Sequence, residues 1–138
     1  MSVSVHDVNS FLKNDSTLQS IAGKTLNFFP VEGYGSETPP FVVYFYTPYI
    51  PSVEDFWNRY DNIRYSIFDS DVDRLFKISE RFIYLLGRGD TVAETGGIES
   101  SHHRFKASIF VGSNLSEPIE KEGWYQMDLD FRVYSTAI

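Results

Sequence analysis

Residues 59–86 read RYDNIRYSIFDSDVDRLFKISERFIYLL, and this stretch decides the fold because the spacing of its apolar residues changes along it. Over residues 59–67, Ile63, Tyr65 and Ile67 alternate with polar residues, which is the two-residue period of a half-buried strand. From residue 71 to 86 the apolar residues recur at three- and four-residue steps, which predicts an amphipathic helix. The predicted apolar stripe of this helix consists of Val72, Leu75, Phe76, Phe82, Ile83 and Leu86.

The acidic run at 69–73 (DSDVD) has two interpretations. Counted as a calcium loop, it supplies a carboxylate at the twelfth position, Glu80, but its sixth position is Arg74, where the sharp turn of such a loop requires glycine. Acidic residues also complement the dipole of a helix in its first turn. We therefore expect this run to begin the helix, with Asp69 or Ser70 as the cap.

The residues before this stretch predict two short helices and a strand. Residues 3–13 place apolar side chains at helical spacing, and residues 16–22 follow a possible cap at Asp15. A strand over 25–29 is expected to end at Pro30.

The next strand, 41–47, is continuously apolar or β-favouring, which is typical of a strand that is buried on both faces. It is bounded by prolines. Residues 48–56 are predicted to form a loop, because Pro48 and Pro51 interrupt regular structure.

The last third of the chain predicts a long polar loop and two strands. The loop covers 87–102, a length that is usually functional or mobile in a compact domain. The strands, 105–111 and 125–133, both show alternation, which is clean in the second, and 112–123 is expected to form a polar connection between them. The sequence therefore predicts one α+β domain over 1–138. Its sheet is mixed, mainly antiparallel and of about five strands, with one main helix packed on a face and short N-terminal helices.

Composition excludes several functional classes. The chain has 138 residues, no cysteine, a net charge of −7 and 17% aromatic residues. The absence of cysteine excludes disulfide scaffolds, cysteine-ligated metal sites and thiol nucleophiles. The negative charge argues against an extended duplex-binding face. No segment has the apolar character of a signal peptide or membrane helix, so we expect a soluble intracellular protein. Its glycine-containing loops match no phosphate-binding pattern, and we expect no cofactor.

Two carboxylates near the C-terminus are the main candidates for chemistry. Asp128 and Asp130 lie two residues apart on a predicted strand and therefore on one face of the sheet. Paired carboxylates can share acid and base roles, but they also form the polar side of a surface strand. Arg132 continues the same face and would partly neutralise them. With no second motif in support, we interpret the pair as surface residues.

Aromatic residues crowd the stretch from 44 to 65. They form either a large aromatic core or a protein–protein interface, where aromatic residues are enriched. Base stacking is a third interpretation, but it requires a basic groove as well. The candidate interface residues are Tyr44, Tyr46, Tyr49, Phe56, Trp57 and Tyr60.

The order of these elements resembles that of the tail terminator proteins of tailed bacteriophages, which are also called tail completion or neck proteins. The resemblance rests on a short amphipathic N-terminal helix, the strand PFVVY at 40–44 and the strand RYSIFD at 64–69. The second strand runs directly into a helix that ends in the leucine pair 85–86. A long loop and a closing pair of strands, within 103–111 and 124–134, complete the pattern over nearly the whole chain.

The resemblance implies a non-enzymatic structural protein of the virion that assembles in the host cytoplasm. Such proteins form homo-oligomeric rings, usually hexamers, on the last ring of tail tube subunits, where they stop tube growth and dock the head-completion or connector protein. DNA passes through the ring without specific binding, and no membrane is involved. Asp128 and Asp130 are candidates for lining that channel.

Two alternatives remain open. The first is another neck or baseplate adaptor protein of a phage, which has the same kind of composition. The second is a small ligand-binding or enzymatic domain whose pocket is lined by Tyr44, Tyr46, Trp57 and Tyr65.

Overall fold

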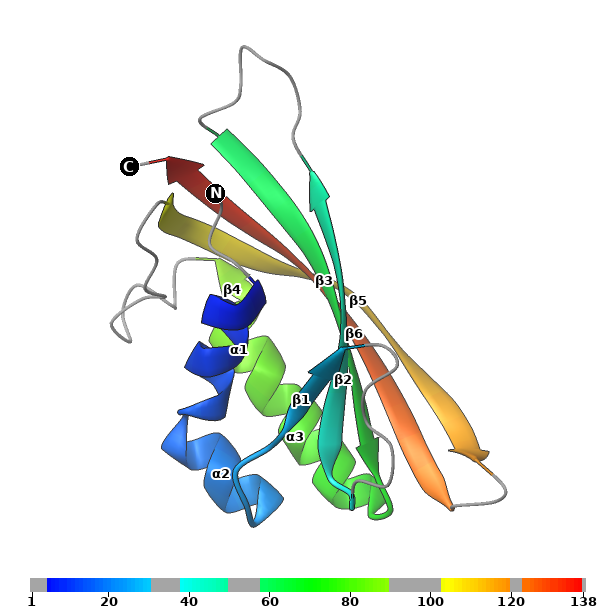
Figure 1. Cartoon of the computed structure of the whole chain (residues 1–138). Helices are drawn as coiled ribbons and strands as arrows, with labels where there is room; N and C mark the ends of the chain where they lie inside the picture. Colours follow the sequence, from blue (N-terminus) through cyan, green and yellow to red (C-terminus); the bar gives the residue numbers. More distant parts are fainter. Residues whose placement is uncertain (1–4, 31–37, 50–57, 90–102, 120–122, 138) are drawn as a thin grey trace.

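The computed structural model of the chain describes residues 5–30, 38–49, 58–89, 103–119 and 123–137 (Figure 1). Their helices are Val5–Lys13 (α1), Ser16–Ala22 (α2) and Val72–Leu86 (α3). Their strands are Phe28–Pro30 (β1), Phe41–Tyr49 (β2), Asn58–Asp69 (β3), Arg88–Gly89 (β4), His103–Ile119 (β5) and Trp124–Ala137 (β6).

The strands form one mixed sheet with the order β1-β2-β3-β6-β5-β4. β1 and β2 are parallel, and every other pair of neighbours is antiparallel. All three helices lie on one side of this sheet (Figure 1). The predicted α+β fold is confirmed, including the main helix and the two short N-terminal ones. The two-residue strand β4 had no signal in the sequence.

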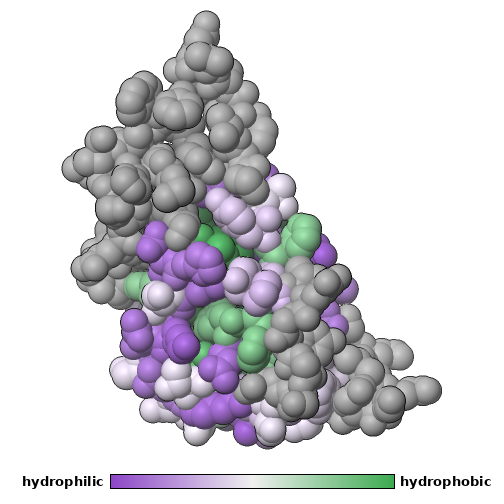
Figure 2. Space-filling model, in the orientation of Figure 1, coloured by the Kyte–Doolittle hydropathy of each residue, from purple (hydrophilic) through white to green (hydrophobic). Residues whose placement is uncertain are grey.

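The main core lies between the helices and the sheet. Ile63, Tyr65 and Ile67 of β3 point into it, as the alternation predicted, and β6 contributes its own alternate residues. Over the helices the outer surface in Figure 2 is mainly hydrophilic, which is the expected outer side of amphipathic helices. The fully or nearly buried members of this core from α3 and β6 are Leu75, Ile78, Phe82, Leu85, Leu86, Met127, Leu129, Phe131 and Val133.

A buried hydrogen bond joins α1 to the centre of the sheet. The hydroxyl of Tyr65 donates to Oδ1 of Asn9 at 2.7 Å, and the Tyr65 side chain is fully buried. Burial raises the pKa of Tyr65 well above its ordinary value, because the charged form would lose its water. The phenol therefore stays protonated, and its hydroxyl remains a donor to α1.

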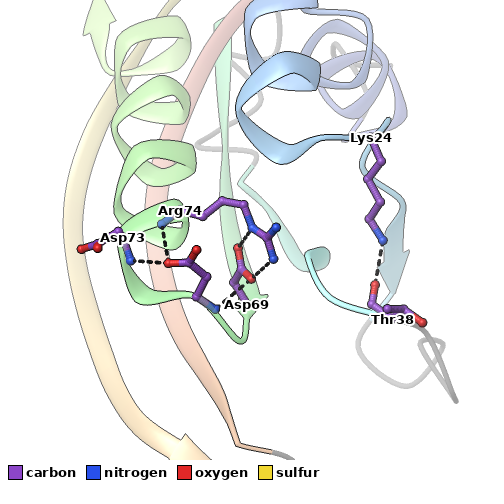
Figure 3. Close-up of polar contacts among 6 residues, drawn as sticks. Lys24, Thr38, Asp69, Asp73 and Arg74 are labelled. Carbon is purple, nitrogen blue, oxygen red and sulfur yellow. Dashed lines mark hydrogen bonds and ion pairs between the residues drawn. The ribbon is translucent and has the colours of Figure 1, made fainter.

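The turn from β3 into α3 is held by carboxylates (Figure 3). Asp71 is the N-cap, and its side chain accepts hydrogen bonds from the backbone of Asp73 and Arg74. The prediction of Asp69 or Ser70 as the cap was therefore wrong. Asp69 is buried instead, where it accepts two hydrogen bonds from the Arg74 guanidinium at 2.6 and 2.7 Å and a third from the Asp71 backbone.

The predicted apolar stripe of α3 includes one exposed residue and leaves out two buried ones. Phe76 is 42% exposed, whereas Ile78 and Leu85, which the prediction left out, are buried. The helix turns by 3.6 residues per turn, so Phe76 lies beyond the edge of the face that Leu75, Ile78 and Phe82 present to the sheet.

Four strands, β2, β3, β5 and β6, are longer than predicted. β2 continues through Pro48, which pairs with Asp61 of β3 in an antiparallel register. β1 ends opposite Tyr44, so the later part of β2 has no strand on its other side among the described residues. Proline is tolerated there because its missing N–H falls on the edge side of the strand.

β5 also extends beyond the predicted strand and takes up most of the predicted connection. It continues to Ile119 and pairs with β6 as far as Trp124. Its register shifts between Ser116 and Ile119, and Pro118 lies within this irregular step. Prolines in sheets occur at such bulges, so the proline did not end the strand. The predicted polar loop at 87–102 lies mostly outside the described residues.

An ion pair links α2 to α3. Asp15 caps α2 by accepting the backbone N–H of Leu18 at 2.8 Å, and it also accepts two hydrogen bonds from Arg81 at 2.9 and 3.0 Å. The guanidinium of Arg81 also lies over the ring of Tyr84, 4.8 Å from its centre. The hydrogen bonds from Arg81 lower the pKa of Asp15, and burial opposes this only in part.

This ion pair predicts an acid-sensitive contribution to stability. A carboxyl whose pKa is lower in the folded than in the unfolded state stabilises the fold while it is ionised. The contribution is complete above the ordinary value of 3.8 and is lost as the pH falls through the lower, folded pKa. We expect Asp15→Asn, which keeps a capping oxygen, to lower the melting temperature more at about pH 6 than at about pH 3. Thermal unfolding at the two pH values checks this, and an equal effect at both would contradict it.

Candidate functional surface: the open sheet face

The side of the sheet that faces away from the helices is named the open face here. No helix of the described residues covers it (Figure 1). It carries the alternate side chains of β2, β3 and β6. One end is apolar and well packed, because Phe41, Val43 and Phe68 form a small buried cluster with Phe29 and Trp124 against it. The centre is mainly polar, with the exposed ring of Phe45 beside it.

A bidentate ion pair lies at the centre of the open face. Arg64 of β3 donates to both carboxylate oxygens of Asp130 on β6, at 2.8 and 3.2 Å. The two residues are direct cross-strand partners in the register of the sheet. The hydrogen bonds with Asp130 raise the pKa of Arg64 above its ordinary value. Both side chains are partly exposed, so the pair orders the surface more than it stabilises the fold.

The neighbouring polar side chains are also joined across strands. Asp128 accepts hydrogen bonds from the hydroxyl of Ser66 at 2.6 Å and from the amide of Gln126 at 2.8 Å. Further along, Arg132 donates to Asn62 at 3.4 Å. Asp128 and Asp130 therefore lie on one face, as their spacing predicted. Asp130 is neutralised by Arg64, a partner that the sequence did not suggest. Arg132, the expected partner, donates to Asn62 instead.

This bonding makes the centre of the open face electrically balanced. Its described charged side chains are Arg64, Arg132, Asp128 and Asp130, two of each sign. The net charge of −7 is therefore carried elsewhere. The centre of the open face therefore does not create a strong negative potential at Asp128 and Asp130 of the kind that would repel DNA.

Two shallow depressions flank the ion pair. One, of about 370 Å³, lies between Phe45, Val111 and Asp130, and the other, of about 390 Å³, lies between Phe45, Ser66 and Gln126. Phe45 and Val111 are each 56% exposed. Phe45 was absent from the candidate interface residues, although strand alternation predicts that it points away from Tyr44 and Tyr46.

The structure separates the predicted interface residues. Tyr44 and Tyr46 are half-buried against the main core on the helix side of the sheet, and the ring of His6 lies edge-on to Tyr44 at 6.3 Å. Tyr49 and Tyr60 are cross-strand partners in β2 and β3. Phe56 and Trp57 lie outside the described residues.

The alternative sites find little support in the described part of the chain. No group of three or more histidine, cysteine, aspartate or glutamate side chains there is arranged to hold a metal ion. Both oxygens of Asp69 are bound to Arg74, which leaves the acidic run as a helix start. Tyr65 is fully buried and bonded to Asn9, so it does not line an open pocket. No described helix is both long and apolar enough to cross a membrane.

Comparison with known proteins gives a structural match and no sequence match. No protein-family model matches the chain, and no curated protein sequence is significantly similar to it. The fold is similar to that of a chain in a solved structure described as the virion of a native gene transfer agent particle. The TM-score is 0.68 at 16% sequence identity, and the match covers 94% of this chain and 91% of the other. At this level of identity the likeness shows a shared fold.

Proposed function

We propose that this protein is a structural component of a phage-like virion and that it forms a ring that caps the tail tube and joins the tail to the head connector. The observation that carries the proposal is the shared fold, which matches a chain of a gene transfer agent virion over nearly the full length of both chains. The finer role of tail terminator is supported by the order of sequence elements, above all the strand at 64–69 that runs directly into α3.

In the proposed ring, the open face lines the channel. Asp128 and Asp130 then face the DNA, together with Arg64 and Arg132. Duplex-binding faces use lysine and arginine side chains that are available to neutralise phosphates. Here Arg64 is bonded to Asp130 and Arg132 to Asn62, so both cations already have acceptors within the protein. Such a surface suits DNA that slides through without being bound.

The remaining contacts of the proposed ring are made with tail tube protein on one side and the head-completion or connector protein on the other. We assign these contacts to the candidate interface residues, since aromatic side chains are enriched at interface centres. They are Tyr44, Tyr46, Tyr49, Phe56, Trp57 and Tyr60. Subunits would assemble in the host cytoplasm and remain in the neck of the virion. The role requires no catalytic group and no cofactor.

Native mass spectrometry tests the proposal on the purified full-length chain, alone and with tail tube protein. The expected result is a closed homo-oligomer, about a hexamer, that associates with tube ends and limits their growth. A chain that stays monomeric at every concentration and never joins a tube end would contradict it. Stable binding to particles at the baseplate, seen by imaging, would favour an adaptor role instead.

A further inference from the structure

The two edges of the sheet differ in how the backbone of the outermost strand is protected. At one end β1 covers the start of β2, and Pro48 lies in the later part of β2. At the other end β4 pairs only with Ser108 and Ile109 of β5. From residue 110 onward β5 has β6 on one side and, among the described strands, no neighbour on the other. Figure 1 shows this half of β5 at the outer margin of the sheet.

The first part of this exposed edge lacks the usual protection of an edge strand, although Pro118 and a register shift follow it. Residues 110–116 read FVGSNLS and contain neither a charged residue nor a proline. Native proteins normally protect an edge with lysine, proline or a very short strand, because its backbone groups can pair with another chain. The register with β6 shifts before Gly112 and after Ser116, but between these shifts Gly112–Ser116 pair regularly with Asp130–Gln126. This regular stretch is about as long as an average strand.

Apolar side chains accompany this edge on both faces of the sheet. Val111 is 56% exposed and lines the depression next to Phe45 on the open face. Leu115 is 43% exposed and lies opposite Met127, whose side chain is buried on the helix side. Gly112 leaves open space beside the strand, since an added Cβ would meet nothing within 4 Å. A strand added here would cover Val111 on one face and Leu115 on the other.

A second copy is the occupant that fits both the proposed ring and the lack of charge at this edge. Every copy carries a net charge of −7, and a contact that brings like charges close together would oppose assembly. The stretch 110–116 is uncharged, and backbone pairing requires no complementary charges. A contact between this edge and a different surface of the next copy is heterologous, and heterologous contacts form a ring when the rotation between neighbouring copies closes.

We propose that the Gly112–Ser116 edge of β5 pairs by backbone hydrogen bonds with a strand of a second copy of this chain, and that this contact buries Val111 and Leu115. The inference rests on the proposed ring and assigns one side of its subunit contact.

The test compares assembly of the full-length chain with that of Val111→Lys and Leu115→Lys. A lysine at either position places a charge beside the strand, so we expect loss of the oligomer at a concentration at which the unchanged protein is fully assembled. Phe76→Lys is the matched control, because Phe76 is as exposed as Leu115 but lies on α3. It is expected to assemble normally. Circular dichroism and thermal unfolding establish that each variant is folded.

Hydrogen exchange provides a readout of the backbone contact itself. The amides of Gly112–Ser116 should exchange more slowly in the oligomer than in diluted monomer. An oligomer that forms while these amides exchange as fast as in the monomer would overturn the edge contact and leave the ring proposal standing. Equal loss of assembly in Phe76→Lys would also contradict the assignment to this edge. An unchanged protein that stays monomeric under all conditions would overturn both proposals.

Discussion

Replacing Phe82 with alanine is expected to lower the free energy of unfolding by about 3–5 kcal/mol, the usual cost of removing a buried phenylalanine side chain. Phe82 is fully buried between α3 and the sheet. Its ring stacks on that of Phe28, with 6.2 Å between the ring centres, and lies edge-on to that of Tyr65, with 5.5 Å between the ring centres. The loss would remove packing that joins α3 to β1 and β3 at once. Urea denaturation of the two proteins measures the difference.

Phe76→Ala is the matched control for Phe82→Ala, because it makes the same change on the same helix at an exposed position. Its expected effect is within about 0.5 kcal/mol, as for most surface substitutions. Similar losses in the two variants would show that burial on α3 is not distributed as described. A loss well below about 1 kcal/mol for Phe82→Ala would show the same.

Replacing Arg74 with alanine is expected to cost about 3 kcal/mol, because it leaves the charge of Asp69 buried without its cation. The Asp69 side chain is fully buried, whereas that of Arg74 is 33% exposed, which places the expected loss at the low end for buried pairs. The hydrogen bond from the Asp71 backbone N–H to Asp69 remains. Adding Asp69→Asn to the variant should restore part of the stability, since it removes the buried charge.

Arg64→Ala provides the comparison for Arg74→Ala. The Arg64–Asp130 pair has the same bidentate geometry, but its side chains are 53% and 38% exposed. An exposed pair of this kind contributes about 0–1 kcal/mol. Chemical denaturation of the single variants and of the double variant measures both costs. Equal losses for the two arginines would contradict the role given to burial.

The parts of the fold that follow from local pattern could be predicted from the sequence. β3 and α3 were predicted within about two residues, because the change from a two-residue to a helical period is local information. The last two residues of β2 lie beyond the predicted strand, because the prediction ended the strand before Pro48. Its tolerance depends on which side of β2 has a neighbouring strand, and that depends on β1, which is far away in the chain.

The chemistry of the open face could be predicted only in part. That Asp128 and Asp130 share a face followed from their spacing. The partner of Asp130 is Arg64, 66 residues away, and it is set by the register between β3 and β6. Register depends on nonlocal packing, so the neutral character of this face had no signal in the sequence. The exposed edge of β5 was hidden for a similar reason, since its residues resemble a polar connection.

The most direct test of the central claim is the position of this protein in an assembled particle. Low-resolution electron microscopy of particles that carry a labelled copy of the chain would provide it. The account predicts one ring of label at the end of the tail tube next to the head. Label spread along the tube, label at the baseplate, or particles that contain none of this chain would contradict it.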